Sequence, residues 1–192
     1  YRSPWYTPVS QRDWSKVQPI LKGKWPEPFP ELRERPPIEW PSKFAFDSEF
    51  DPLGRLVRYS MAHRNPQGSP ILRVVERGDH VVPSTLPLTL TVAFHSVEAD
   101  LDHLHTLLGH HNVQIKIEDS MYLHAVLAAD LENDLDLVGS IYARTSRWKH
   151  LLRTNPRVYA GGDALGTWDA YQALQAELER DPRVKNVYYN FQ

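Results

Sequence analysis

The chain has 192 residues, no cysteine, 41% hydrophobic and 24% charged residues, and a formal net charge of −2. This length and composition are typical of one globular domain, or one domain plus an extension. The small net charge argues against a broad basic surface for duplex nucleic acid, but it allows a local basic groove or a metal-bridged phosphate site. The absence of cysteine excludes disulfides, thiolate zinc sites and cysteine nucleophiles.

Residues 1–42 differ in composition from the rest of the chain. They contain nine prolines and four tryptophans, and prolines at this density block long helices and central strands. One short helix fits residues 11–21. Because pure linkers rarely carry so many aromatic residues, we interpret residues 1–42 as an extended N-terminal arm whose side chains pack on a globular domain of residues 43–192. A flexible linker to an upstream domain is the alternative.

Strand patterns begin at residue 44. Alternating and β-branched runs predict strands over residues 44–50, 55–63 and 70–76, and the turns between them fit two antiparallel hairpin steps. The apolar run over residues 88–94 predicts a buried strand.

Helical patterns follow these strands. A leucine stripe predicts a helix that begins at Asp100 and ends before Gly109. A short strand and three further helices are then predicted over residues 113–117, 119–129, 133–142 and 157–180. Strands followed by helices, with one strand between helices, predict an α/β fold in which helices cover a sheet.

The first predicted strand becomes acidic at Asp47-Ser48-Glu49. Side chains alternate between the faces of a strand, so Asp47 and Glu49 point to the same side. Two neighbouring carboxylates repel each other, and a hard divalent cation with oxygen ligands would reverse that penalty. A solvated strand end before the turn at residues 51–54 is the alternative interpretation.

Three further residues complete a candidate site. Tyr159 and Asp163 are four residues apart and share one face of the last predicted helix. Gly161 and Gly162 lie between them, at a cost of about 1 kcal/mol each in helix propensity, and would let a strand or substrate approach closely. Asp100 begins the leucine-striped helix, where the helix dipole favours an ionised carboxylate.

These residues together resemble a known family. Phe46-Asp-Ser-Glu49, His95-Ser-Val-Glu-Ala-Asp-Leu101 and Tyr159-x-x-x-Asp163 are similar to the three motifs of the DEDDy 3′–5′ exonucleases. The segment 100–137 resembles the proofreading domain of family A DNA polymerases, with Asp119-Ser-Met121 in place of an Asp-Thr-Met-like turn. The resemblance covers about residues 43–180 and implies a ribonuclease H-like fold, a mixed sheet covered by helices.

The resemblance also implies a chemistry. Asp47, Glu49, Asp100 and Asp163 would bind two Mg²⁺ or Mn²⁺ ions, which suit an all-oxygen site better than zinc does. Such ions activate a water and stabilise the leaving 3′-oxygen, and Tyr159 would orient that water.

Five residues are candidates for contact with the substrate. By the resemblance, Leu53 matches an apolar residue that wedges against the terminal bases. Phe50 replaces a small hydroxyl residue of the family, and Ser96 stands where the family usually has Asn. Lys149 and Arg153 belong to a basic run over residues 144–157, which fits either phosphate contact or a solvated helix face.

We therefore expect a 3′–5′ exonuclease that acts on single-stranded DNA ends as a proofreading domain, with a polymerase domain after Gln192. A ribonuclease D-like enzyme that trims RNA 3′ ends and a catalytically inactive clamp or interaction module are the alternatives. The sequence shows neither a signal-peptide pattern nor an apolar run near ~18 residues. We therefore expect a cytoplasmic protein without a membrane partner, whether cellular, organellar or viral.

Overall fold

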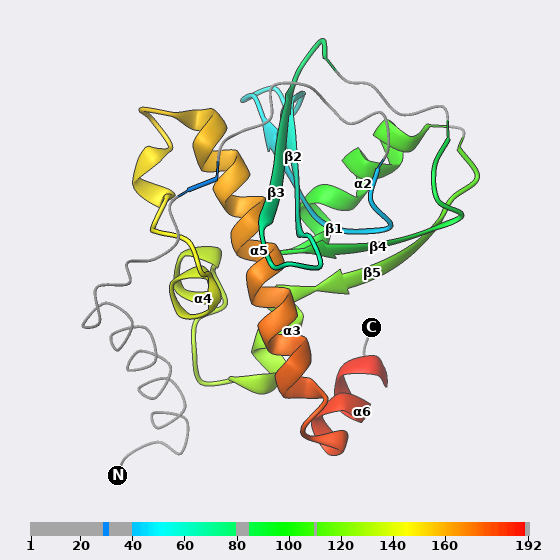
Figure 1. The fold of residues 1–192 in the computed structure, drawn as a ribbon, viewed down its shortest axis with the longest axis vertical. Helices are drawn as coiled ribbons and strands as arrows, with labels where there is room; N and C mark the ends of the chain where they lie inside the picture. Colours follow the sequence, from blue (N-terminus) through cyan, green and yellow to red (C-terminus); the bar gives the residue numbers. More distant parts are fainter. Residues whose placement is uncertain (1–28, 31–39, 80–84, 110, 191–192) are drawn as a thin grey trace.

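The computed structural model describes residues 29–30, 40–79, 85–109 and 111–190 (Figure 1). The predicted helix over residues 11–21 and most of the N-terminal arm lie outside this part of the chain. The elements in chain order are β1 (Lys43–Phe50), β2 (Leu56–Arg64), β3 (Pro70–Glu76), β4 (Thr89–Phe94), α2 (Val97–Leu108), β5 (Gln114–Asp119), α3 (Ser120–Leu127), α4 (Leu135–Tyr142), the 3₁₀ helix η1 (Lys149–Leu151), α5 (Pro156–Leu178) and α6 (Pro182–Asn190).

The strands form one mixed five-stranded sheet in the order β3-β2-β1-β4-β5. β1 pairs antiparallel with β2, and β2 with β3, as the two predicted hairpin steps require. β4 lies between β1 and β5 and is parallel to both. A strand between two parallel neighbours is covered on both faces, which explains why this segment is an apolar run without polar alternation.

The two faces of the sheet have different packing. Phe44 and Phe46 of β1 belong to an apolar cluster with Leu104 and Leu108 of α2. Ala45 points to the opposite face and packs against α5, and the two helices lie on opposite sides of the sheet (Figure 1). The alternation along β1 therefore sends its aromatic residues towards α2 and its acidic residues towards α5.

Helix α5 lies close to the sheet because small side chains line the contact. Ala45, Ala62 and Ala93 of the sheet are fully buried beneath it. The Ser60 hydroxyl donates a hydrogen bond of 2.8 Å to the Ala160 carbonyl of α5, and Ser60 lies directly opposite Asp47 in the β1–β2 register. This bond fixes α5 on the sheet at the level of the acidic residues of β1.

Helix α2 begins at Val97, three residues before the predicted start. Its first turn carries no leucine, so the apolar pattern could not reveal it. Ser96 precedes the helix with φ of 76°, and its side chain makes no capping bond. The Asp119 carboxylate instead accepts a hydrogen bond of 2.6 Å from the Val97 backbone N–H, so the cap comes from a distant segment.

Helix α6 lies beyond the last predicted helix, which ends at residue 180. Asp181 and Pro182 are an N-terminal signal for a helix, and the Asp181 carboxylate accepts a bond from Arg183 N. Tyr188 is 2% exposed, and its hydroxyl lies 3.4 Å from the Glu118 carboxylate.

Within the described residues, no helix is long and apolar enough to cross a membrane.

Trp40 and Phe29, from the predicted N-terminal arm, contact the domain. Trp40 is buried, and its ring packs against Phe44 at a centroid distance of 5.7 Å. Phe29 packs against a cluster that includes Leu165 of α5. The division of the chain at residues 42 and 43 remains a prediction.

Candidate metal centre

Three carboxylates meet where α5 crosses the acidic end of β1. Asp47 and Glu49 come from β1 and Asp163 comes from α5. One carboxylate oxygen of each can be chosen so that the three atoms lie within 4.8 Å of one another. In the described part of the chain this is the one group of three or more histidine or acidic residues that could hold a metal ion.

The electrostatics of this group favour a cation. The Oδ2 atom of Asp47 is buried and has no hydrogen-bond partner among the described residues. Burial raises the pKa of Asp47 well above its usual range, and the charges of Asp163, Asp100 and Glu49 raise it further. Burial and Asp163 also raise the pKa of Glu49. A hard divalent ion would offset this repulsion, and carboxylate oxygens are its preferred ligands.

Asp100 lies beside this group but is not one of the three. It is buried in the first turn of α2, on the opposite side of β1. Its Oδ1 accepts hydrogen bonds from the Ser48 backbone N–H, at 3.0 Å, and from the Ser48 hydroxyl. Burial raises the pKa of Asp100 to about 6, against the lowering effect of Ser48. Its role as a fourth metal ligand remains a prediction.

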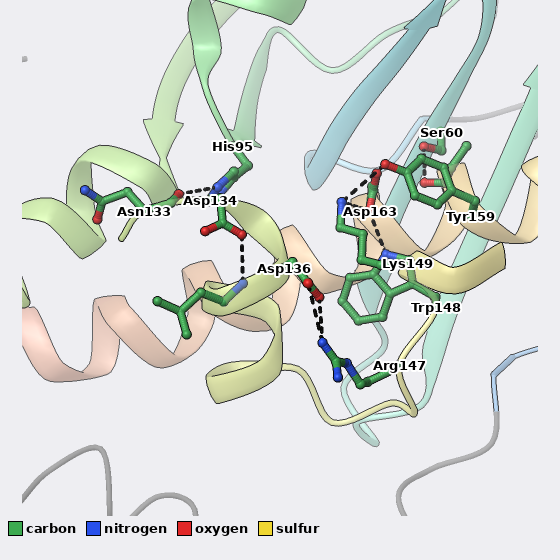
Figure 2. Close-up of polar contacts among 12 residues, drawn as sticks. Ser60, His95, Asn133, Asp134, Asp136, Arg147, Trp148, Lys149, Tyr159 and Asp163 are labelled. Atoms are coloured by element: carbon green, nitrogen blue, oxygen red, sulfur yellow. Dashed lines mark hydrogen bonds and ion pairs between the residues drawn. The ribbon is translucent and has the colours of Figure 1, made fainter. Parts of the chain in front are cut away.

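Lys149 and Tyr159 lie beside Asp163 (Figure 2). The Lys149 ammonium is 2.7 Å from Oδ1 of Asp163 and 3.4 Å from the Tyr159 hydroxyl. It also lies 5.0 Å from the centroid of the Tyr159 ring. Burial and the neighbouring Asp163 carboxylate raise the pKa of Tyr159, so its hydroxyl stays protonated at neutral pH and can donate a hydrogen bond.

Trp148 also contacts the site, and the sequence did not identify it. Its indole N–H donates a hydrogen bond of 2.6 Å to Oδ1 of Asp163 (Figure 2). The sequence predicts that Gly161 and Gly162 let a strand or a substrate approach α5 closely. Gly162 instead makes room for the Trp148 ring, as do Gly139 and Gly166. The four-residue spacing of Gly162 and Gly166 on one helix face was the available signal for a close approach.

The predicted substrate-binding residues occupy varied positions. Leu53 is 74% exposed in the turn between β1 and β2. The Phe50 ring packs on the His103 ring of α2 at a centroid distance of 4.1 Å. Ser96 is half-buried before α2, and Arg153 is exposed in the turn after η1. Their contact with a substrate remains a prediction.

The basic run over residues 144–157 does not form a solvated helix face, because most of it precedes α5. Lys149 contacts Asp163, Arg147 pairs with Asp136 at 3.2 Å, and Arg157 approaches Glu76 at 3.6 Å. The run therefore brings one side chain, Lys149, to the three-carboxylate group.

Asp119 caps α3 through bonds from Met121 N and Tyr122 N, as expected of a helix cap.

The mixed five-stranded sheet with its helical cover is a ribonuclease H-like α/β fold. The chain is similar in structure to NrnC from Brucella melitensis. The structure of NrnC with bound Mg²⁺ has a TM-score of 0.54 and 19% sequence identity, covering 84% of this chain and 85% of NrnC. A second NrnC structure gives 0.55 and 18%, covering 83% and 85%. No protein-family model and no curated protein matches the sequence.

Proposed function

We propose that this chain is an exonuclease that requires divalent metal ions and hydrolyses phosphodiester bonds at the 3′ ends of nucleic acids. The observation that carries the proposal is the convergence of Asp47, Glu49 and Asp163 around one point. The fold adds support, because its structural neighbours are NrnC proteins, one of them with bound Mg²⁺. The DEDDy motif pattern supplies the 3′–5′ direction.

The residues of the site have separate roles in this proposal. Asp47, Glu49 and Asp163 would hold one Mg²⁺ or Mn²⁺ ion, and Asp100 would help to hold a second. Such ions lower the pKa of a bound water and stabilise developing charge on the leaving oxygen. The Tyr159 hydroxyl, which stays protonated, would donate a hydrogen bond that orients the attacking water. Lys149 supplies a positive charge close to Asp163, where a substrate phosphate would approach.

RNA is the substrate that the comparisons favour. The two solved structures to which this chain is similar are of NrnC rather than of a DNA polymerase. The proofreading assignment, with a polymerase domain after Gln192 and single-stranded DNA as substrate, rests on motif resemblance alone. We therefore infer that RNA trimming is the primary activity and that DNA proofreading is the second candidate function.

The experiment compares 5′-labelled RNA and DNA oligonucleotides of one sequence. We expect a ladder that shortens from the 3′ end, requires Mg²⁺ or Mn²⁺, stops with chelator, and runs faster on RNA. Asp47→Asn and Asp163→Asn should abolish the ladder, because each removes a negative ligand of the metal. Asp130→Asn, at an exposed position in the α3–α4 connection, is the matched control. Full activity in chelator would contradict the proposal, and faster cleavage of DNA would restore the proofreading assignment.

Two measurements separate this enzyme from an inactive clamp of the same fold. Calorimetric titration with Mn²⁺ reports metal binding without turnover. Tyr159→Phe should keep the wild-type Mn²⁺ affinity and lower turnover at least about tenfold, within the range usual for groups that position or transfer a proton. An absence of turnover in a wild-type protein that binds both Mn²⁺ and RNA would favour the clamp.

A further inference from the structure

Trp148 joins two parts of the fold that are separate in the sequence. It lies just before η1, is 3% exposed, and donates its indole N–H to Oδ1 of Asp163 at 2.6 Å. Lys149 contacts the same oxygen at 2.7 Å. Two donors therefore fix one oxygen of this carboxylate, and Oδ2 takes part in neither bond.

Three glycines from two helices form a slot for the indole, which we call the glycine slot. It consists of Gly139 on α4 and of Gly162 and Gly166 on α5. A Cβ atom at any of the three would lie within 3.0 Å of the Trp148 ring, a distance that real Cβ atoms essentially never show. Gly162 faces the pyrrole side of the ring, whereas Gly139 and Gly166 face its six-membered side.

The glycine slot lowers the helix propensity of α4 and α5, and packing alone would not require this loss. Each glycine within a helix is less favourable than alanine, so all three residues disfavour the helices that contain them. A smaller apolar side chain at position 148 would fill the space between alanines. The indole adds a directed N–H donor, held in one orientation because the slot contacts the ring at both ends.

A neutral donor suits a metal ligand. The indole N–H has no charge, so it orients the carboxylate without cancelling the negative charge that attracts a cation. Lys149 lies on the same oxygen but carries a positive charge, which opposes a nearby metal ion. Of Trp148 and Lys149, Trp148 is the donor whose bond to Asp163 remains favourable when a cation is bound.

We propose that Trp148 is a positioning residue for the metal centre, and that the glycine slot holds its indole so that Asp163 presents its carboxylate towards Asp47 and Glu49. This inference rests on the proposed metal-dependent function. It assigns a role to Trp148, Gly139, Gly162 and Gly166, which the exonuclease motifs do not include. Ligating carboxylates are commonly held by such hydrogen bonds, and losing the partner typically lowers metal affinity or activity about 10–100-fold.

The first test measures Mn²⁺ affinity by calorimetry and by electron paramagnetic resonance of the free ion. Trp148→Phe removes the N–H, and we expect it to weaken Mn²⁺ binding about 10–100-fold. Trp168→Phe is the matched control, because Trp168 is another buried tryptophan, 7% exposed, that packs against Ala45 and Ala93. We expect Trp168→Phe to lower the melting temperature while leaving the Mn²⁺ affinity within about twofold of wild type.

Two further variants separate the hydrogen bond from the packing of the ring. Benzothienylalanine at position 148 replaces the indole N–H by sulfur, keeps the ring shape and should fold as the wild type does. We expect it to bind Mn²⁺ as weakly as Trp148→Phe does. Gly139→Ala alters no carboxylate but displaces the ring, so it should also weaken binding, whereas Ser140→Ala, at the exposed neighbouring position, should not.

The outcomes distinguish this inference from the proposed function. A wild-type protein that binds no Mn²⁺ would contradict both. A wild-type protein that binds Mn²⁺, together with a benzothienylalanine variant of unchanged affinity, would overturn the role of Trp148 and leave the exonuclease proposal intact. Weaker binding in the benzothienylalanine and Gly139→Ala variants, with unchanged binding in both controls, would support it.

Discussion

Ser48 separates two carboxylates on β1 and faces the opposite side of the sheet. Because of this alternation, Asp47 and Glu49 approach Asp163 of α5, whereas Ser48 bonds to Asp100 of α2. The four acidic residues of the motif pattern thus lie on both faces of one strand, with three on the α5 side and Asp100 on the α2 side. The Asp100 carboxylate accepts hydrogen bonds from the hydroxyl and the backbone N–H of Ser48, and it is not part of the three-carboxylate group.

The raised pKa of Asp100 gives a pH-dependent stability. Its folded value is about 6 against an ordinary 3.8, so the folded protein binds this proton more tightly than the unfolded chain does. The resulting stability is present below pH 3.8 and is lost as the pH rises through 6. The full difference corresponds to roughly 3 kcal/mol of unfolding free energy at most.

Asp100→Asn tests this directly, since asparagine keeps an acceptor oxygen for Ser48. In chelator, the wild type should lose stability relative to this variant between pH 4 and pH 7, as measured by urea unfolding at several pH values. Asp130→Asn should follow the pH dependence of the wild type. A constant difference between wild type and Asp100→Asn over this range would show that Asp100 is not held in a raised-pKa environment.

At the scale of elements, α5 organises the molecule. Its residues 160–170 are buried on all sides, because the helix packs on the sheet and against α3 and α4. It carries a second buried acid, Asp169, which accepts two bonds from the Arg64 guanidinium, at 2.7 and 2.8 Å, and one from Arg144 N. Asp163 and Asp169 lie in the middle of one helix and have different partners. Asp163 belongs to the three-carboxylate group, and Asp169 belongs to a buried ion pair.

Breaking the buried pair should be costly. Asp169→Asn leaves the Arg64 side chain, 8% exposed, without its carboxylate, and we expect the unfolding free energy to fall by about 3–5 kcal/mol. Asp136→Asn breaks the exposed pair with Arg147, whose side chains are 52% and 74% exposed, and should cost at most about 1 kcal/mol. Equal losses in urea unfolding would contradict a structural role specific to Asp169.

For the whole molecule, the position of Leu53 relates the site to its substrate. This side chain is 74% exposed in the β1–β2 turn, which follows the acidic end of β1. Terminal nucleotides must unstack before they enter a pocket. Single-stranded ends should therefore be degraded faster than blunt duplex ends, and an exposed apolar residue near the site would help to separate the bases.

Leu53→Ala should reduce turnover on frayed or duplex ends several-fold, on the order of 1 kcal/mol, without changing Mn²⁺ affinity. Leu88→Ala is the control. Leu88 is 85% exposed but precedes β4, at the opposite end of the parallel β1–β4 pair from Asp47. Equal rates on single-stranded and duplex ends, or equal effects of the two variants, would remove the assignment of Leu53 as a wedge.

The sequence by itself predicted the five strands, the helices α2 to α5 and the acidic residues of the site. Alternation placed Asp47 and Glu49 on one face of a strand, and helical spacing placed Tyr159 and Asp163 on one face of a helix, since both periods are fixed by backbone geometry. Asp119 and Asp134 indicated where α3 and α4 begin, because a capping side chain bonds to backbone N–H groups within three residues of its own position. The order of strands and helices predicted an α/β fold with helical cover, and the resemblance to the DEDDy exonucleases implied that the sheet is mixed.

Only the tertiary structure decided which of these residues meet. Asp163 reaches β1 because α5 packs on the sheet, where Ser60 bonds to Ala160, a residue 100 positions away. No local pattern contains that contact. Trp148 could not be recognised as part of the site, because the glycines that surround its ring belong to two different helices, α4 and α5. The predicted start of α2 is three residues too late because a contact between distant segments is involved here as well. Its cap, Asp119, belongs to another segment, and hydrogen bonds between distant segments form only when the chain is folded.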